Sequence, residues 1–144
     1  MYIFLDIDGV LNKRSDWERP FSLDAECVRN FNELVSRIPD AKIVLSSTWR
    51  NGIARDGSIA AHIEDLMKVL SIAGIKTIDR TASSPDGCRN REINYYLRRH
   101  EEDSYIILDD DLELFENGIE TENLYVINSE YGFQKSDIAK ILKK

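Results

Sequence analysis

The chain has 144 residues, of which 42% are hydrophobic and 31% charged, a composition typical of one globular domain. No apolar stretch approaches the roughly 20 residues of a membrane-spanning helix, and a net charge of −7 argues against tight nonspecific binding of nucleic acid. No secretory signal pattern is present and Cys27 and Cys88 are far apart, so we expect one cytoplasmic domain over residues 1–144, without membrane contact.

Five short apolar segments alternate with amphipathic stretches along the chain. The predicted strands are Tyr2–Leu5, Lys42–Leu45, Ile75–Ile78, Tyr105–Leu108 and Leu124–Ile127. The stretches with helical spacing are Val28–Ile38, Ile59–Leu70, Ile93–Leu97 and Ile138–Leu142. This alternation predicts an α/β fold in three layers, a Rossmann-like parallel sheet with helices on both faces. Right-handed crossovers restrict it to a few doubly wound arrangements.

The first predicted strand ends in two alternating carboxylates and a glycine: Asp6, Asp8 and Gly9. Burial of the apolar run puts both acids at the carboxyl end of the strand, where open α/β sheets bind their ligands. Because a strand repeats every two residues, both side chains are able to lean to one side, and Gly9 permits a sharp turn after them. Two acids this close favour binding of a divalent cation.

A long loop, Asn12–Leu23, follows the first strand and carries Trp17 and Phe21. Long ordered loops at strand ends often hold substrate. Two interpretations of these aromatic residues are open: stacking on a leaving group such as a nucleobase, or packing on the rim of the sheet. Packing is the preferred interpretation.

Three hydroxyls end the second predicted strand: Ser46, Ser47 and Thr48. Together with backbone amides they are able to bind an oxyanion, although Ser and Thr are also common in capped turns. The first two strands are expected neighbours, which would turn these hydroxyls toward Asp6.

Three other polar residues receive weaker assignments. Arg50 has two open interpretations, a contact with substrate or an ion pair with the acidic cluster. His62 and His100 fall in helical stretches, which we expect to lie away from the site, and neither is assigned a catalytic role.

Two arginines, Arg89 and Arg91, stand at the start of the third helical stretch. A cation at a helix start opposes the helix dipole, so structural reasons alone would favour an acid there. A guanidinium at that place is able to clamp a phosphoryl group, which makes either arginine a functional candidate. The alternative is a solvated surface arginine.

The fourth predicted strand ends in three consecutive acids, Asp109, Asp110 and Asp111. One of them is able to cap a following helix, but capping does not account for three. We therefore predict that Asp109 or Asp110 binds a metal ion together with the acids that follow the first strand.

These motifs, in this order at the ends of parallel strands, resemble the haloacid dehalogenase (HAD) superfamily of phosphotransferases. The residues that carry the resemblance are Asp6, Asp8, Gly9, Ser46, Arg89, Asp109 and Asp110. The family commonly has lysine at the third motif, where this chain has arginines. Arg89 fits the spacing to Ile93 better than Arg91, and Ser47 or Thr48 replaces Ser46 if the strand runs further.

The segments LDIDGVLN, STWR and ILDDD resemble, more narrowly, the small HAD-like domains found alone or beside RNA-repair modules. That resemblance implies sheet order 5-4-1-2-3 and no large cap domain, with the Asn12–Leu23 loop as a flap. It implies a phosphorylated substrate, with a nucleotide or a polynucleotide end as a candidate.

The resemblance also implies a mechanism, a Mg²⁺-dependent phosphomonoester hydrolysis through an aspartyl-phosphate. Asp6 would be the nucleophile and Asp8 the general acid and base. The implied phosphate-binding residues are Ser46, Ser47 and Arg89, and the implied metal ligands are Asp6, Asp8 through its backbone carbonyl, Asp109 and Asp110. Two alternatives remain open: a phosphotransferase that uses an acceptor other than water, and a non-catalytic metal-binding module of a larger assembly. A receiver-like domain suits the DxDG opening poorly.

Overall fold

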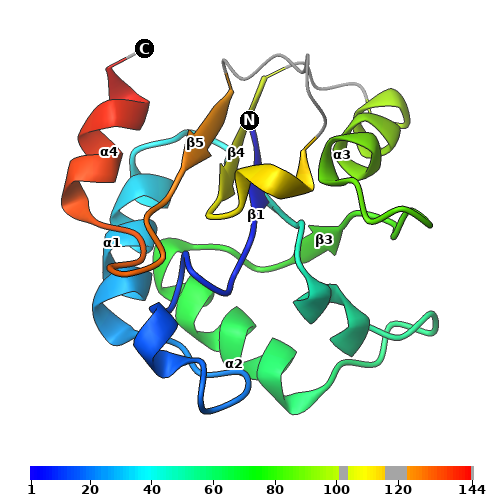
Figure 1. Ribbon diagram of the computed structural model, residues 1–144, viewed down its shortest axis with the longest axis horizontal. Coiled ribbons are helices and arrows are strands. Elements are labelled where there is room, and N and C mark those ends of the chain that lie inside the picture. Colours follow the sequence, from blue (N-terminus) through cyan, green and yellow to red (C-terminus); the bar gives the residue numbers. More distant parts are fainter. Residues whose placement is uncertain (101–103, 116–122, 144) are drawn as a thin grey trace.

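One parallel sheet forms the centre of the computed structural model, which describes residues 1–100, 104–115 and 123–143 (Figure 1). Its strands are β1 (Tyr2–Leu5), β2 (Lys42–Leu45), β3 (Ile78–Arg80), β4 (Tyr105–Asp109) and β5 (Leu124–Val126). They lie in the order β3-β2-β1-β4-β5, with every neighbouring pair parallel. This is the expected order 5-4-1-2-3 from the other edge, so the predicted sheet is confirmed.

Helices cover both faces of the sheet, but unequally (Figure 1). The four α-helices are α1 (Ala25–Ser36), α2 (Ala61–Leu70), α3 (Arg89–Arg98) and α4 (Lys135–Leu142). Buried side chains of α1, α2 and α4 share the larger core, whereas α3 packs into the smaller core on the other face. The chain passes through α3 between the edge strand β3 and the central strand β4. This crossover runs across the sheet in the opposite sense to those from β1 to β2 and from β2 to β3, so right-handedness places α3 on the opposite face.

The alternating side chains of β1 divide between these two cores. Ile3 and Leu5 pack with the larger core, and Tyr2 and Phe4 pack with the smaller one. All four are buried, so the strand tolerates no polar residue until it ends. The first acid after Leu5 therefore lies at the carboxyl edge of the sheet.

The third strand differs from the predicted Ile75–Ile78. Gly74 ends the helical segment before it with a left-handed φ of 87°, and the Ile75 N–H then donates to the Leu70 carbonyl at 3.4 Å. Ile75 thus packs against the larger core as a helix-end residue, and β3 begins at Ile78, which pairs with Ile43. Apolar character alone does not separate these two roles.

The side of β1 on which successive strands are added to the sheet changes between β2 and β4. From β1 the chain moves to β2 and β3 on one side, and later to β4 and β5 on the other. Such a switch point leaves a crevice beyond the carboxyl ends of the two central strands. Within residues 1–100, 104–115 and 123–143 no large cap domain is present, in agreement with the predicted fold. Among the described residues, no helix is long and apolar enough to cross a membrane.

Candidate active site

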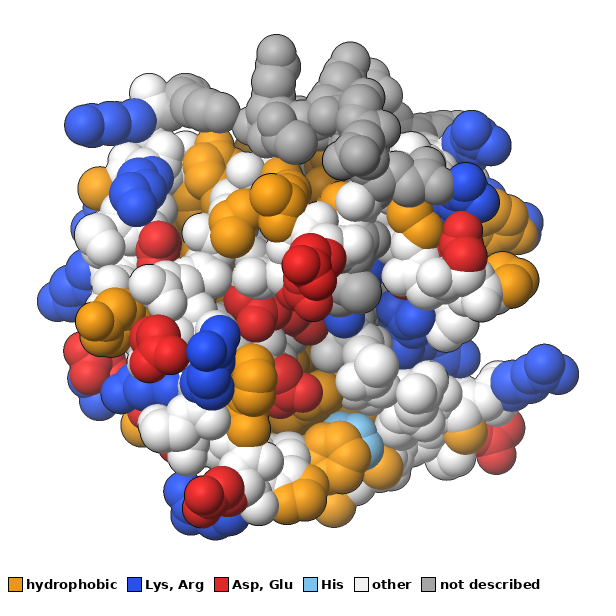
Figure 2. Space-filling view, in the orientation of Figure 1, with side chains coloured by type: hydrophobic (Ala, Val, Ile, Leu, Met, Phe, Trp, Pro, Cys, Tyr) orange, Lys and Arg blue, Asp and Glu red, His pale blue; other side chains and the backbone are white. Residues whose placement is uncertain are grey.

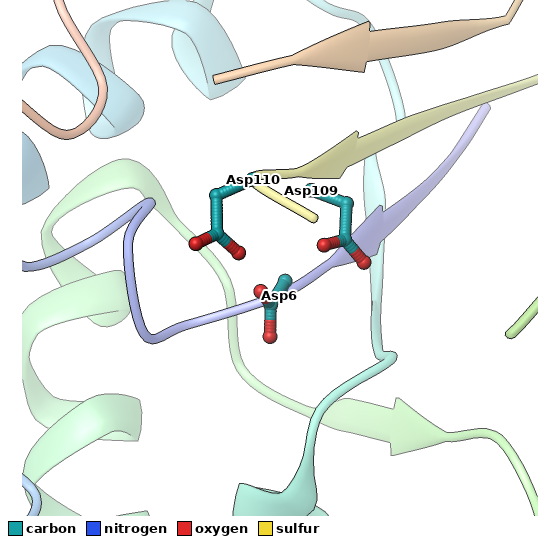
Figure 3. Close-up of side chains that lie close together, drawn as sticks. All are labelled: Asp6, Asp109 and Asp110. Atoms are coloured by element: carbon teal, nitrogen blue, oxygen red, sulfur yellow. The ribbon is translucent and has the colours of Figure 1, made fainter. Parts of the chain in front are cut away.

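Three carboxylates converge at the carboxyl ends of β1 and β4 (Figure 3). Asp6 follows β1 directly, and its backbone N–H donates to the Leu108 carbonyl at 3.0 Å, which continues the strand pairing. Asp109 ends β4 and Asp110 follows it. One oxygen of each acid lies within 4.8 Å of the others. Asp6 and Asp109 are buried and Asp110 is half-buried.

Gly9 allows Asp110 to lie against the turn that follows β1. Its φ of 89° lies in the left-handed region, which a residue with a Cβ rarely adopts. A Cβ at this position would also collide with the Asp110 carboxylate. The turn thus requires glycine both for its backbone conformation and for the close approach of an acid.

Arg89, the first residue of α3, pairs with two of these acids, Asp6 and Asp109. Its Nη1 lies 3.1 Å from Asp6 Oδ1 and 2.7 Å from Asp109 Oδ2. Arg91 lies elsewhere, exposed and paired with Asp86 at 2.8 Å. Of the two candidate arginines, the structure brings Arg89 to the acids.

A single guanidinium does not balance this negative charge. Burial raises the pKa of Asp6 well above its ordinary value and the charge of Asp109 raises it further, while Arg89 opposes the shift. The pKa of Asp109 is also raised by burial, again against the effect of Arg89. The ionised acids are therefore disfavoured without a further cation. Carboxylate oxygens are the ligands that hard divalent cations prefer, so the donor set of Asp6, Asp109 and Asp110 fits such an ion.

The hydroxyls after β2 have different surroundings. Ser47 caps the short 3-10 helix η2 (Thr48–Gly52), with its Oγ accepting from the Trp49 N–H at 3.2 Å. Ser47 and Thr48 line a cavity that Asp6 and Asp110 also line, whereas Ser46 does not. The Ser46 carbonyl accepts from Arg89 Nη1 at 2.7 Å, and its buried Oγ has no hydrogen-bond partner among the described residues. The cavity thus reaches Ser47 rather than Ser46.

Asp8 is held through one of its two carboxylate oxygens. Asn12 Nδ2 donates to Asp8 Oδ1 at 2.9 Å, and Trp49 Nε1 donates to the same oxygen at 3.3 Å. No described residue makes a hydrogen bond or ion pair with Oδ2. The side chain lies outside the three-acid group, so the expected ligation through the Asp8 backbone carbonyl stays a prediction.

Asn12 is the first residue of the flap, the Asn12–Leu23 loop, and its side chain links Asp8 to later residues of that loop. Its buried amide uses all four of its hydrogen-bonding positions. Oδ1 accepts from the Gly9 N–H at 2.8 Å and from Trp17 Nε1 at 3.0 Å. Nδ2 donates to Asp8 and, at 2.9 Å, to the Ser22 carbonyl. No role for Asn12 was predicted from the sequence; its place four residues after Asp8, within the turn, was the available signal.

Asn12→Asp is expected to lower the free energy of unfolding by about 2–4 kcal/mol. The replacement turns both donations of Nδ2 into contacts between oxygens, one of them with the Asp8 carboxylate. Chemical denaturation measures the change, and Asn51→Asp, at an exposed position, is the matched control with a change within about 0.5 kcal/mol. Equal effects of the two substitutions would contradict the role given to Asn12.

Of the two open interpretations of Arg50, the ion pair with the acidic cluster is wrong, and the side chain does not line the cavity. It pairs with Glu92 in a bidentate manner, Nη1 to Oε1 and Nη2 to Oε2, both at 3.1 Å. Both side chains are largely buried. Glu92 lies in the first turn of α3, so this pair fixes the helix start that carries Arg89. Sequence reasoning missed Glu92; an acid three residues after Arg89, in the first helical turn, was the signal.

A cavity of about 460 Å³ opens above the acids, as the hollow in Figure 2 shows. Its lining residues are Asp6, Asp8, Trp17, Arg19, Pro20, Phe21, Ser47, Thr48, Trp49, Arg89, Asp110 and Asp111. Trp17 and Phe21 are 44% and 53% exposed. Both expected site regions, the acids and the flap, therefore share one cavity.

His62 lies nearer to this cavity than we predicted. Its ring stacks on Phe21 with 3.8 Å between centroids and meets Trp49 edge-on at 5.3 Å. His100 instead stacks on Tyr96 and does not line the cavity. The position of His62 in α2 brings it under the flap, which the helical pattern alone did not indicate.

Comparison with protein families gives one match. The family described as the HAD domain in Swiss Army Knife RNA repair proteins matches residues 2–138. This match confirms the resemblance drawn from the motifs at the strand ends. No curated protein and no solved structure matches the chain.

Proposed function

Because the chain belongs to the family of HAD domains in Swiss Army Knife RNA repair proteins, we propose that it is a Mg²⁺-dependent phosphomonoester hydrolase acting through a phosphorylated aspartate. The observation that supports this most is the convergence of Asp6, Asp109 and Asp110 beside Arg89. Hydrolysis of p-nitrophenyl phosphate with Mg²⁺, and its loss in EDTA, is the direct test.

Asp6 is the proposed nucleophile. Its carboxylate attacks phosphorus, the bond from phosphorus to the leaving oxygen breaks, and an aspartyl-phosphate and an alcohol result. Water then attacks the phosphorus of that intermediate and returns free Asp6 and inorganic phosphate. The position of Asp6 at the floor of the cavity, beside Arg89 at 3.1 Å, supports this role.

Asp8 is the proposed general acid and then general base. Its Oδ1 accepts two N–H donors, from Asn12 and Trp49. A proton on that oxygen would displace them, so the proton given to the leaving oxygen belongs on Oδ2. In the second step Oδ2 takes a proton from the attacking water.

Arg89 and the hydroxyls after β2 are the proposed phosphate-binding groups. A guanidinium and hydroxyl donors stabilise the negative charge that develops on the phosphoryl oxygens in the transition state. Ser47 and Arg89 line the cavity directly. Ser46 would act through its carbonyl, which accepts a hydrogen bond from Arg89. Ser47 would contact the phosphoryl group directly.

Mg²⁺ would be held by Asp6, by Asp109 or Asp110, and by the backbone carbonyl of Asp8. When bound, it supplies positive charge beside the transferring phosphoryl group. The pKa values of Asp6 and Asp109 are raised, as described above, and binding of the ion would relieve the repulsion between these acids.

Mg²⁺ is expected to raise the thermal unfolding midpoint, and by more as the pH rises from about 5 to about 8. Asp6 and Asp109 have raised pKa values in the folded chain. Their contribution to stability is therefore present below the ordinary carboxyl pKa of about 4 and is lost as the pH rises through the raised values. Mg²⁺ binds the ionised acids and restores it, by about 2.7 kcal/mol at a hundredfold excess over Kd.

Thermal unfolding in Mg²⁺ and in EDTA across this pH range measures the effect. Asp110→Asn should reduce the shift, whereas Asp65→Asn, on the exposed side of α2, should leave it unchanged. A shift that is independent of pH, or that survives Asp110→Asn in full, would contradict the proposed site.

The proposed substrate is a phosphorylated molecule, with a nucleotide or a nucleic-acid end as the leading class. Transfer to water rather than to an alcohol is part of the proposal. Product analysis with added glycerol distinguishes the two, because a phosphotransferase would form glycerol phosphate.

A further inference from the structure

Two exposed aromatic side chains of the flap line the cavity, and the mechanism above uses neither. Trp17 and Phe21 are each about half exposed, although both belong to an ordered loop. Figure 2 shows hydrophobic side chains beside the acidic cluster at the hollow. Exposed aromatic rings that share a concave cavity with a few polar groups are typical of a ligand pocket, and Trp17 and Phe21 have this setting.

Trp17 is held in place from two directions. Its Nε1 donates to Asn12 Oδ1 at 3.0 Å, and the Arg14 guanidinium lies 5.8 Å from the ring centroid. The indole is thus oriented by its polar edge and by a cation at the ring. It still contributes surface to the cavity.

Phe21 is held equally firmly. His62 stacks on it with rings 12° apart, and Trp49 meets it edge-on at 5.4 Å between centroids. Its φ of 58° lies in the left-handed region, which is disfavoured for a residue with a Cβ and persists where the surroundings fix it. Among the ring contacts of the described residues, Phe21 makes none with Trp17.

Both rings adjoin the residues that hold the proposed general acid, Asp8. Asp8 Oδ1 is held by Asn12 and Trp49. These same two residues contact Trp17 and Phe21, respectively. Asp8, Trp17 and Phe21 line the same cavity, so the two rings border the space next to the proposed general acid.

We propose that Trp17 and Phe21 form a stacking subsite for the base of a nucleoside leaving group. This inference rests on the proposed phosphatase function and deepens it, because it names the residues that would select a nucleoside leaving group. A base offers a flat apolar face of the kind that stacks on aromatic side chains. The cavity of about 460 Å³ has room beyond a phosphoryl group, and Arg19 lines its rim.

Matched substrates test the subsite. Adenosine 5′-monophosphate and ribose 5-phosphate carry the same phosphorylated sugar, and only the first carries a base. We expect kcat/KM to be about 5- to 150-fold higher for the nucleotide, the range of stacking on an aromatic residue. Adenosine 3′-monophosphate repeats the test for the other end of a nucleotide.

Substitution of the rings should remove this preference. Phe21→Ala and Trp17→Ala are expected to lower the nucleotide-to-sugar ratio of kcat/KM several-fold each, and Phe21→Leu tests whether apolar bulk suffices. Tyr95→Ala is the matched control, because Tyr95 is an exposed aromatic residue of α3 that does not line the cavity. A ratio near one in the wild type, or a ratio that both alanine variants leave unchanged, would overturn the subsite. Equal preference for phosphotyrosine would also overturn it, since a single phenol ring would then suffice.

A binding measurement separates this inference from the proposed reaction. Trp17 is exposed and Trp49 is buried, so a stacked base should quench Trp17 fluorescence. Adenosine 5′-monophosphate should quench the Asp6→Asn variant, and Trp17→Phe in that background should remove the quenching. Quenching without hydrolysis by the wild type would leave the subsite and reject the phosphatase. Hydrolysis of adenosine 5′-monophosphate and ribose 5-phosphate with equal kcat/KM would support the phosphatase and reject the subsite.

Discussion

Asp6→Asn is expected to reduce the hydrolysis of p-nitrophenyl phosphate by on the order of 10⁴-fold or more, as removal of a nucleophile does in other covalent catalysts. The amide has the same shape but does not attack phosphorus. The variant should fold, because Asp6 follows β1 and its backbone N–H, rather than its side chain, continues the strand pairing. Initial rates and circular dichroism measure both outcomes.

A second property of this variant separates a catalytic role from a structural one. Without metal at neutral pH, Asp6→Asn should be at least as stable as the wild type. The pKa of Asp6 is raised by burial and by Asp109, so the charge that the substitution removes is an unfavourable one. Activity within tenfold of wild type, or a large loss of stability, would contradict the assignment.

Arg89→Met is the second substitution with a large expected effect. Arg89 pairs with Asp6 and Asp109, and all three side chains are at least 89% buried, with exposures of 11%, 6% and 1%. Loss of one partner from a buried ion pair costs about 3–5 kcal/mol, because uncompensated charge stays behind. Activity should fall by about 10²- to 10³-fold, as for the loss of one donor to a developing negative charge.

Chemical denaturation in EDTA and in Mg²⁺ measures the stability of this variant. Mg²⁺ should recover part of the loss, since it supplies positive charge to the same acids. Arg91→Met is the matched control, because Arg91 lies two residues along the same helix in an exposed pair with Asp86. Its effect should stay within about 0.5 kcal/mol. Equal losses for the two variants would show that Arg89 has no special role.

Much of the fold follows from the sequence because its three central strands, β1, β2 and β4, are mostly buried. The run Tyr2–Leu5 is apolar at every position, which predicts a central parallel strand, and it is β1 as predicted. The helical stripes likewise identified α1 and α4. The edge strand β3 did not follow, since only three residues form it and two of them are polar. Ile75, which suggested the strand, belongs to the end of the preceding helix.

The candidate site was also predictable from the sequence only in part. Acids that end buried strands must meet at one edge of the sheet, so the proximity of Asp6 to Asp109 was predictable. The partners of Arg50 and Asp8 were not. Glu92 and Asn12 reach them through turns and helix starts, where one residue of difference in register changes which side chains meet. The choice between Arg89 and Arg91 depended on the same local geometry.

Chemical trapping detects the proposed covalent intermediate on Asp6. After rapid mixing with p-nitrophenyl phosphate and Mg²⁺, an acid quench and borohydride reduction convert an aspartyl-phosphate to homoserine, which peptide mass spectrometry locates. We expect homoserine at position 6, dependent on substrate and absent from the Asp6→Asn variant. Hydrolysis at full rate with position 6 unmodified, or with the label on another residue, would contradict it.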